Sequence, residues 1–295
     1  MNNRRQNGDG SFTPIVRSVT APPLRAPTVG RGRSSRPRVS LGAMDHQASG
    51  APLVIGARYN GPPGSGNGGY CSGRFALAAG LPGDAVEVTL RRPPPLEVEL
   101  TPRPADPGVD IFHDQELVAQ VRPATIAPDE IVEPVGWDEA VAASAHYPGL
   151  VTHPFPTCFV CGPQRATGDG LRLFPGRLPD GRTATPWTVP EPSGPEPTAP
   201  ESTVPVSSAA EATAPELVWA SLDCPGGWAI PLEGRPYVLG RLAVRIVRTP
   251  APGQRCVVMG QVTGEDGRKA YVRSSLWGPD GDLLAQARAT WLAVT

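Results

Sequence analysis

The sequence predicts an α+β protein whose folded part consists of two halves with the same order of elements. Two sets of short segments alternate apolar and polar residues with a period of two, which is typical of half-buried antiparallel strands. A short helical segment precedes each set of strands. Turn residues such as Pro252-Gly253 and Pro279-Asp280-Gly281 separate neighbouring strands. We therefore expect antiparallel sheet in both halves, with one helix before each set of strands.

Composition and charge predict a soluble intracellular protein. The 295 residues are 39% hydrophobic, which is enough for a sizeable core in one or two domains. A net charge of -1 provides no overall field that would attract nucleic acid or an anionic membrane. No apolar run is long enough to span a membrane, and no signal-peptide core is recognisable near the first residues. Five cysteines, an odd and sparse number, indicate reduced thiols, so we expect a cytoplasmic location.

Two segments have compositions that predict disorder. Residues 1–50 place arginines among Ser, Pro and Gly, and residues 187–214 are mostly Pro, Ser, Thr, Glu and Ala. Neither segment can bury enough apolar surface to offset the loss of chain entropy on folding. The basic segment is interpreted either as an arm for nucleic acid or as an uninvolved tail, and its composition favours the tail.

The first half, residues 51–123, begins with a strand at 53–59 and a glycine-rich loop. A helix is predicted over 69–79, because Gly80 and Pro82 are typical of a helix C-terminus. A four-stranded meander is then predicted, with strands at 85–91, 96–101, 109–113 and 117–122.

A connector, residues 124–152, leads to the second half, residues 153–295. The connector contains an Ala-rich helical segment at 137–147, and a strand candidate follows at 170–174. A helix is predicted over 215–222, and Asp223-Cys-Pro-Gly-Gly227 interrupts it. Another four-stranded meander is predicted to complete this half, with strands at 237–248, 255–263, 270–277 and 283–294.

The glycine-rich loop, residues 60–71, carries the first chemical signal. A Gly-Gly pair at the start of a helix leaves backbone N–H groups without side chains in front of them. Such groups suit an anion or a developing oxyanion. No Gly-Lys-Ser/Thr follows, so the loop is not a phosphate-binding P-loop. Ser72 and Ser221 lack the context of a nucleophile elbow, and Cys71 has no local His or acid, so we expect it to be a packing residue.

The repeated order of elements resembles the double hotdog fold, in which antiparallel sheet wraps around a central helix. Four local motifs add to the resemblance, which covers roughly residues 53–123 and 153–295. Asn67-Gly-Gly-Tyr70 resembles the helix start of hotdog acyl-CoA thioesterases, and Leu222-Asp223 resembles the Leu-Asp of their central helix. The other two motifs are Cys158-Phe-Val-Cys-Gly162 with Gly170-Leu171, and the hairpin turn at 264–269. The resemblance implies a tandem (double) hotdog.

The same resemblance implies a single composite site. In hotdog thioesterase dimers one subunit offers a Gly-Gly helix start, and the other offers an acid about three turns along its own helix. In this chain, Ala76 occupies the acid position of the first helix, nine residues after Asn67. Nine residues before Asp223, the second helix has Ala214-Pro215-Glu216 in place of Gly-Gly. Each half keeps what the other lacks, so one composite site is expected from two.

By resemblance, the reaction is hydrolysis of a small-molecule acyl thioester such as an acyl-CoA. Asp223 is the candidate general base or nucleophile. The N–H groups of Gly69 and Tyr70, with Gly68 beside them, are the candidate donors to the thioester oxygen. Asn67 is the candidate group that orients the carbonyl or the water.

Arg268 and Lys269, on a predicted hairpin, are candidate contacts for CoA phosphates.

Each assignment has an alternative. In these alternatives, Asp223 only caps the end of a broken helix, and Asn67 is an ordinary turn residue. The two glycines then serve close packing, and Arg268 and Lys269 lie in a solvated turn. The alternative function is a non-catalytic acyl or CoA-ester binder, and a scaffold that docks partners through its Pro-rich segment is a third. The sequence leaves a homodimer open.

Cys158 and Cys161 form a single Cys-x-x-Cys motif with His153 upstream. A structural zinc site needs four ligands, and the candidates for the others, Cys71, Cys224 and His146, lie far away in the sequence. A redox dithiol would require a βαβ setting, which is absent. We therefore expect no metal and no cofactor.

Overall fold

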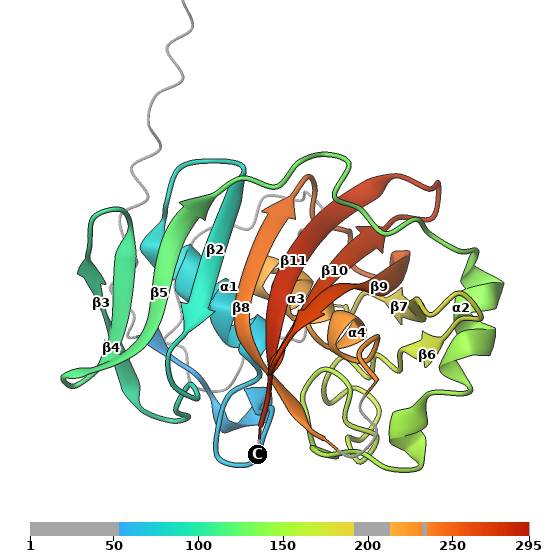
Figure 1. Ribbon diagram of the computed structural model, residues 1–295, viewed down its shortest axis with the longest axis horizontal. Coiled ribbons are helices and arrows are strands. Elements are labelled where there is room, and N and C mark those ends of the chain that lie inside the picture. The colour runs from blue at the N-terminus through green and yellow to red at the C-terminus, as the bar shows by residue number, and fades with distance from the viewer. Residues whose placement is uncertain (1–52, 192–212, 232–234, 295) are drawn as a thin grey trace, which may run out of the picture. The chain divides into compact units, whose positions relative to one another are not determined.

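The structure, a computed structural model, describes residues 53–191, 213–231 and 235–294 (Figure 1). The tail predicted at 1–50 lies outside the described residues, as do residues 192–212 of the predicted insertion. The division of the chain at residues 123 and 153 stays a prediction.

A single antiparallel sheet of eleven strands dominates the described part of the chain. Along the sheet, the strands follow the order β1-β3-β4-β5-β2-β8-β11-β10-β9-β7-β6. The strands are β1 (Leu53–Val54), β2 (Ala85–Leu90), β3 (Glu99–Pro104), β4 (Val109–His113), β5 (Glu116–Ala124), β6 (Gly176–Arg177), β7 (Thr183–Thr188), β8 (Tyr237–Ile246), β9 (Arg255–Asp266), β10 (Lys269–Trp277) and β11 (Leu283–Ala293).

The strand order is mirrored about the seam where β2 pairs with β8. Outward from this seam the first half runs β2, β5, β4 and β3, and the second half runs β8, β11, β10 and β9. The predicted four-stranded meanders are therefore wrong in order. In each predicted meander, only the last three strands pair in chain order. The first strand, β2 or β8, pairs with the last strand of its own half, β5 or β11. This arrangement covers both edges of β2 and β8.

Two helices lie side by side behind the sheet in Figure 1. They are α1 (Gly68–Ala79), which packs on β2 and β8, and α3 (Pro215–Ser221), which packs on α1. A one-turn helix, α4 (Cys224–Gly227), follows α3 and packs on β9 and β10. In the connector, α2 (Trp137–Ser144) packs on β7 near the far end of the sheet. None of the helices that the structure describes has the length and apolar character needed to cross a membrane.

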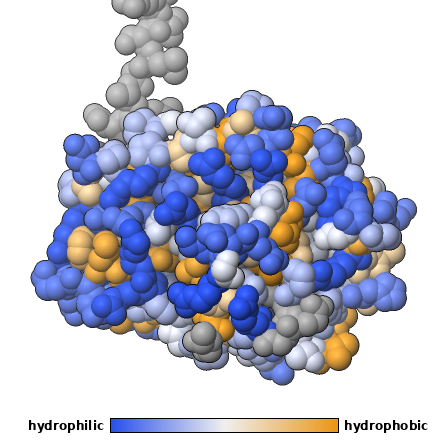
Figure 2. Space-filling model, in the orientation of Figure 1, coloured by the Kyte–Doolittle hydropathy of each residue, from blue (hydrophilic) through white to orange (hydrophobic). Residues whose placement is uncertain are grey.

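The core lies between the sheet and the helices. In β8, Leu242 and Val244 are buried, whereas Arg241 and Arg245 point to the other face. Charged side chains on that outer face form ion pairs across strands, such as Arg241 with Glu87 at 3.5 Å. Figure 2 shows this face as mainly hydrophilic, with smaller apolar groups between the polar side chains. The period-two pattern therefore places one face of the sheet in the core and the other in solvent.

Three local predictions are corrected by the structure. Residues 170–174 are not a strand, because Leu171 and Leu173 bond to the backbone of residues 159 and 160 instead of to a sheet edge. The predicted insertion begins too early, because Trp187 is buried in β7. The strand expected over 53–59 ends at Val54 and is followed by a 3-10 turn at Ala57–Tyr59.

Candidate functional site

The first residues of α1 are held by a side-chain cap and by stacked aromatic rings. Asn67 is the N-cap, and its Oδ1 accepts a hydrogen bond from the backbone N–H of Tyr70 at 2.9 Å. The ring of Tyr70 stacks on Tyr59 at a centroid distance of 3.9 Å. Residues 60–66, the part of the glycine-rich loop that precedes the N-cap, are thus anchored at the N-terminus of α1.

Glycines on α1 allow α3 to approach closely. A Cβ at Gly69 would lie 2.5 Å from Cβ of Asp223 and 2.9 Å from the carbonyl oxygen of Trp219. A Cβ at Gly73 would lie 2.8 Å from Cα of Glu216. These contacts run in opposite directions along the two helices, so α1 and α3 are antiparallel. The start of α1 therefore meets the end of α3.

Asp223 follows α3 and binds the start of α1. Its Oδ2 accepts hydrogen bonds from the N–H of Gly69 at 2.9 Å and from Nδ2 of Asn67 at 3.0 Å. The side chain is 2% exposed, and Oδ1 has no hydrogen-bond partner in the part of the chain that the structure describes. Burial raises the pKa of Asp223 to about 7, with the nearby Cys158 adding to the rise and the two hydrogen bonds opposing it.

The structure thus brings together Asp223, Asn67 and Gly69, three of the five residues that the sequence placed at the composite site. It does not leave the predicted oxyanion donors free. The N–H of Gly69 is bonded to Asp223, and the N–H of Tyr70 is bonded to Asn67. Both N–H groups therefore already have acceptors in this structure, because helix capping and the buried acid compete for them. Asp223 itself does not cap α4 through its side chain.

Gly68 remains as a donor at the helix start. Within the described residues, its N–H has no hydrogen-bond acceptor, and the residue lines a cavity. A Cβ at this position would lie 2.8 Å from Cδ2 of Leu239, so the glycine also serves close packing. Gly68 therefore serves close packing, and its N–H has no partner among the described residues.

The cavity has a volume of about 360 Å³, which lies in the range of small-molecule sites. Its wall includes Asn67, Gly68 and Asp223 among the polar groups. Apolar side chains from both halves of the chain complete it, namely Leu90, Phe155, Trp228, Leu239, Trp291 and Leu292. The indole N–H of Trp291 has no hydrogen-bond partner among the described residues. An apolar cavity with a few polar groups suits an acyl chain with one polar end.

Basic residues line the cavity, but they are not the pair that the sequence singled out. Arg268, on the turn between β9 and β10, and Lys269, the first residue of β10, are exposed and are not part of the cavity wall. Arg91 and Arg92, which follow β2, are exposed and do line it. Arg92 pairs with Glu116 at 3.2 Å on the surface. The sequence analysis did not identify Arg91 and Arg92, because nothing in the residues around them indicates that they lie beside the N-termini of the helices.

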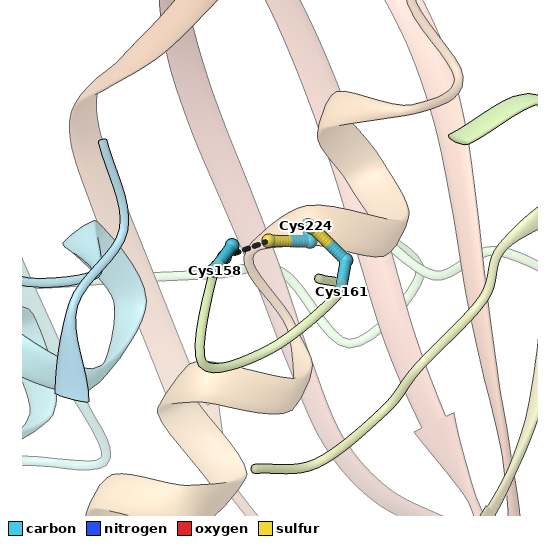
Figure 3. A group of neighbouring side chains, drawn as sticks. All are labelled: Cys158, Cys161 and Cys224. Carbon is cyan, nitrogen blue, oxygen red and sulfur yellow. Dashed lines mark hydrogen bonds between the residues drawn. The ribbon is translucent and has the colours of Figure 1, made fainter. Parts of the chain in front are cut away.

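Three cysteines meet at the same cavity (Figure 3). Cys158 and Cys161 belong to one loop, and Cys224 is the first residue of α4. Their Sγ atoms lie within 4.8 Å of one another, and all three thiols are buried and free. Cys224 therefore joins the Cys-x-x-Cys motif in space, although it lies 63 residues after Cys161 in the sequence. Cys71 is a packing residue, because it is fully buried and burial raises its pKa.

Comparison with solved structures finds a similar fold at low sequence identity. The tesB protein of Mycobacterium avium subsp. paratuberculosis is 11% identical, with a TM-score of 0.50 over 80% of this chain and 90% of that chain. The chain described here therefore has the hotdog fold. A protein with a hotdog fold from Alicyclobacillus acidocaldarius is 13% identical, with a TM-score of 0.42 over 81% of this chain and 90% of its own. Escherichia coli PaaI, from the phenylacetic acid degradation operon, is 10% identical, with a TM-score of 0.37 over 53% and 96%.

Protein-family profiles and curated protein sequences show no match to the chain. The likeness to the solved structures therefore concerns the fold, and the chemistry has to be argued from the residues of this site.

Proposed function

We propose that this protein hydrolyses an acyl thioester at one composite site between two hotdog modules of a tandem arrangement. The observation that carries the proposal is the contact of Asp223 with Asn67 and Gly69 beside an apolar cavity. The acid comes from the second half of the chain, and the helix start comes from the first.

The mirrored strand order supports the tandem arrangement. Each half has a central helix, and the strand that follows this helix, β2 or β8, pairs at the seam. The remaining strands of each half follow outward in the same order. Two modules related in this way bring α1 and α3 together antiparallel, as the glycine contacts of α1 require.

In the proposed reaction Asp223 acts as the general base. Its carboxylate takes a proton from a water molecule, and the oxygen of that water forms a bond to the thioester carbonyl carbon. The tetrahedral intermediate then expels the thiolate, which takes up a proton, so that a carboxylic acid and a thiol leave. Nδ2 of Asn67 holds the carboxylate in place at 3.0 Å.

The thioester oxygen is proposed to bind at the N–H of Gly68, which lines the cavity and has no acceptor among the described residues. A single well-placed donor of this kind contributes about 3 kcal/mol to transition-state stabilisation. The N–H of Gly69 joins it only if Asp223 shifts away, because the two groups are bonded at 2.9 Å.

For a CoA ester, we place the phosphates near Arg91 and Arg92, at the edge of the cavity. Arginine forms paired hydrogen bonds with phosphate oxygens. To do so here, Arg91 would exchange its exposed hydrogen bond to Gln120, at 2.7 Å, and Arg92 its surface ion pair with Glu116. Arg268 and Lys269 remain the weaker choice, because they lie outside the cavity wall. The five free cysteines support a reducing compartment such as the cytoplasm for this reaction.

A non-catalytic acyl binder is the second candidate, and one observation favours it. Asp223 is 2% exposed, and its Oδ2 already joins the two halves through hydrogen bonds to Gly69 and Asn67. In this alternative the acid fastens the helices together while the cavity holds an acyl ester without cleaving it.

The test is a panel of acyl-CoA thioesters assayed with the wild type, Asp223→Asn and Glu216→Gln. Glu216 is a matched control, because it is an acid of α3 that does not line the cavity. Loss of the general base is expected to lower kcat about 100-fold or more, with KM nearly unchanged, and Glu216→Gln is expected to keep full activity. Equal turnover by the wild type and Asp223→Asn would end the proposed catalytic role. Saturable binding of an acyl-CoA with no turnover by the wild type would establish the binder instead.

A further inference from the structure

We propose that Cys158, Cys161 and Cys224 bind a thiophilic divalent metal ion, Zn²⁺ or a similar ion, through three thiolate ligands at the wall of the cavity. This site is separate from the proposed hydrolysis, because no step of that reaction uses the thiols.

The sulfur positions match a metal site before any ion is added. In a tetrahedral centre with Zn–S bonds of about 2.3 Å, two sulfur atoms lie about 3.8 Å apart. The Sγ atoms of Cys158 and Cys224 are 3.9 Å apart, and all three Sγ atoms lie within 4.8 Å of one another. Small side-chain movements are therefore enough to close the three ligands around one ion.

The backbone at the motif is shaped as a tight turn. The N–H of Gly162 donates to the carbonyl oxygen of Cys158 at 2.9 Å, which brings Cys158 and Cys161 onto the same side of the turn. A Cβ at Gly162 would lie 2.5 Å from the backbone nitrogen of Cys158, so only glycine fits. A Cys-x-x-Cys turn with a third cysteine supplied from elsewhere is a common pattern of zinc ligands.

The side-chain amide of Asn67 lies beside two of the three sulfur atoms. Nδ2 of Asn67 lies 3.8 Å from Sγ of Cys158 and 3.9 Å from Sγ of Cys224. Donors of this kind stabilise thiolates and orient them around a metal ion. The same asparagine also holds Asp223, so the thiols and the acid share one polar neighbour.

His153 is a positioning residue and not a ligand. Its Nδ1 accepts a hydrogen bond from the N–H of Phe155 at 2.9 Å. The neutral ring therefore carries its proton on Nε2, which lies 3.3 Å from Sγ of Cys161 and donates to it. The histidine thus orients the Cys161 thiolate from outside the metal.

Three thiolate ligands require that the thiols give up their protons. Binding of a divalent ion releases these protons to solvent and balances the negative charge of the thiolates.

The fourth ligand comes from the cavity. All three cysteines line it, so a water molecule or the thiol of a small molecule can reach the ion. Three protein ligands with one open position are typical of zinc sites that bind an exchangeable ligand.

The test measures the metal content of the full chain, purified without chelators from cells grown with added zinc. About one Zn²⁺ per chain is expected in the wild type, and each of Cys158→Ser, Cys161→Ser and Cys224→Ser is expected to lose it. Cys256→Ser is the matched control, because Cys256 is a buried free cysteine outside the cavity wall. His153→Gln is expected to keep the stoichiometry with an affinity about 10- to 100-fold lower.

Titration of the reduced, metal-free wild type with Co²⁺ requires no variant and remains informative if a variant fails to fold. Thiolate-to-cobalt charge-transfer bands that saturate near one equivalent are expected, because thiolates would ligate the ion directly. Absence of both zinc and these bands would overturn the proposal. So would full retention of zinc by the three serine variants. None of these measurements uses an acyl thioester, so their failure is distinct from failure of the proposed hydrolysis.

Discussion

The two central helices, α1 and α3, occupy corresponding places in the mirrored sheet but begin differently. The first has the N-cap Asn67, whose side chain bonds to the helix, followed by two glycines. The second has Ala214, which makes no side-chain cap, followed by Pro215. At their other ends the difference is reversed, because an acid, Asp223, follows only α3. The N-terminus of α1, with its two glycines, therefore meets an acid of the other half. The N-terminus of α3 has no corresponding contact among the described residues.

This asymmetry concentrates the polar groups at one end of the helix pair. Asp223, Asn67 and the three cysteines lie on the wall of one cavity, where burial strengthens every charge effect. At the opposite end, Gly73 packs against Glu216 and Trp219. The buried polar groups therefore lie at one end of the helix pair, whereas the other end contributes packing.

The largest effect is expected from pH, which changes the charge of the buried Asp223. The pKa of Asp223 is about 7 in the folded protein and 3.8 in an unfolded chain. Because the folded state holds the proton more tightly, its stability is expected to fall as the pH rises from about 4 to 7, by about 4 kcal/mol in total. Asp223→Asn is expected to remove this decline.

The measurement is urea unfolding at several pH values, in a buffer with a chelator so that the thiols hold no metal. The difference between the wild type and Asp223→Asn isolates the contribution of this carboxyl group from those of the exposed acids. Glu216→Gln is expected to keep the wild-type slope. Parallel profiles for the wild type and Asp223→Asn would contradict the role of burial at this position.

A smaller effect is expected from removing the close approach at the start of α1. In Gly69→Ala, the new Cβ would lie 2.5 Å from Cβ of Asp223, so α1 and α3 must move apart. The free energy of unfolding is expected to fall by about 3 kcal/mol. Gly136→Ala, at the N-cap of α2 with no atom within 4 Å of the new Cβ, is expected to cost much less. Similar losses in the two variants, measured by chemical denaturation, would show that helix contact does not require Gly69.

The smallest effect is expected from giving α3 the cap that it lacks. Ala214 is exposed and sits at the N-cap of α3 without a side-chain hydrogen bond. Ala214→Ser supplies an oxygen for a free N–H of the first turn and is expected to stabilise the protein by about 1 kcal/mol. Asn67→Ala, at the start of α1, is expected to act in the opposite direction. A thermal melt that moves the same way in both variants would contradict the contrast between the two helix starts.

Much of the secondary structure could be predicted, because its signals are local. The helix that begins at Gly68, the strands of the second half and the helix at Pro215 follow from periodicity and from glycine and proline at their ends. The order of strands could not be predicted this way. Which strand edges pair depends on contacts between residues far apart in sequence. The predicted meander would pair β2 with β3, whereas β2 pairs with β5 and β8 in the structure.

The candidate site divides in the same way. The sequence by itself determined the helix start at Asn67, the acid at Asp223 and the Cys-x-x-Cys turn, because each depends on neighbouring residues. Only the tertiary structure decided that Asp223 occupies the N–H of Gly69, and that Cys224 joins Cys158 and Cys161. These outcomes require two distant segments to meet in a space from which water is largely excluded. The packing of α1 on α3 and of α4 on the sheet creates that space, and no local pattern encodes it.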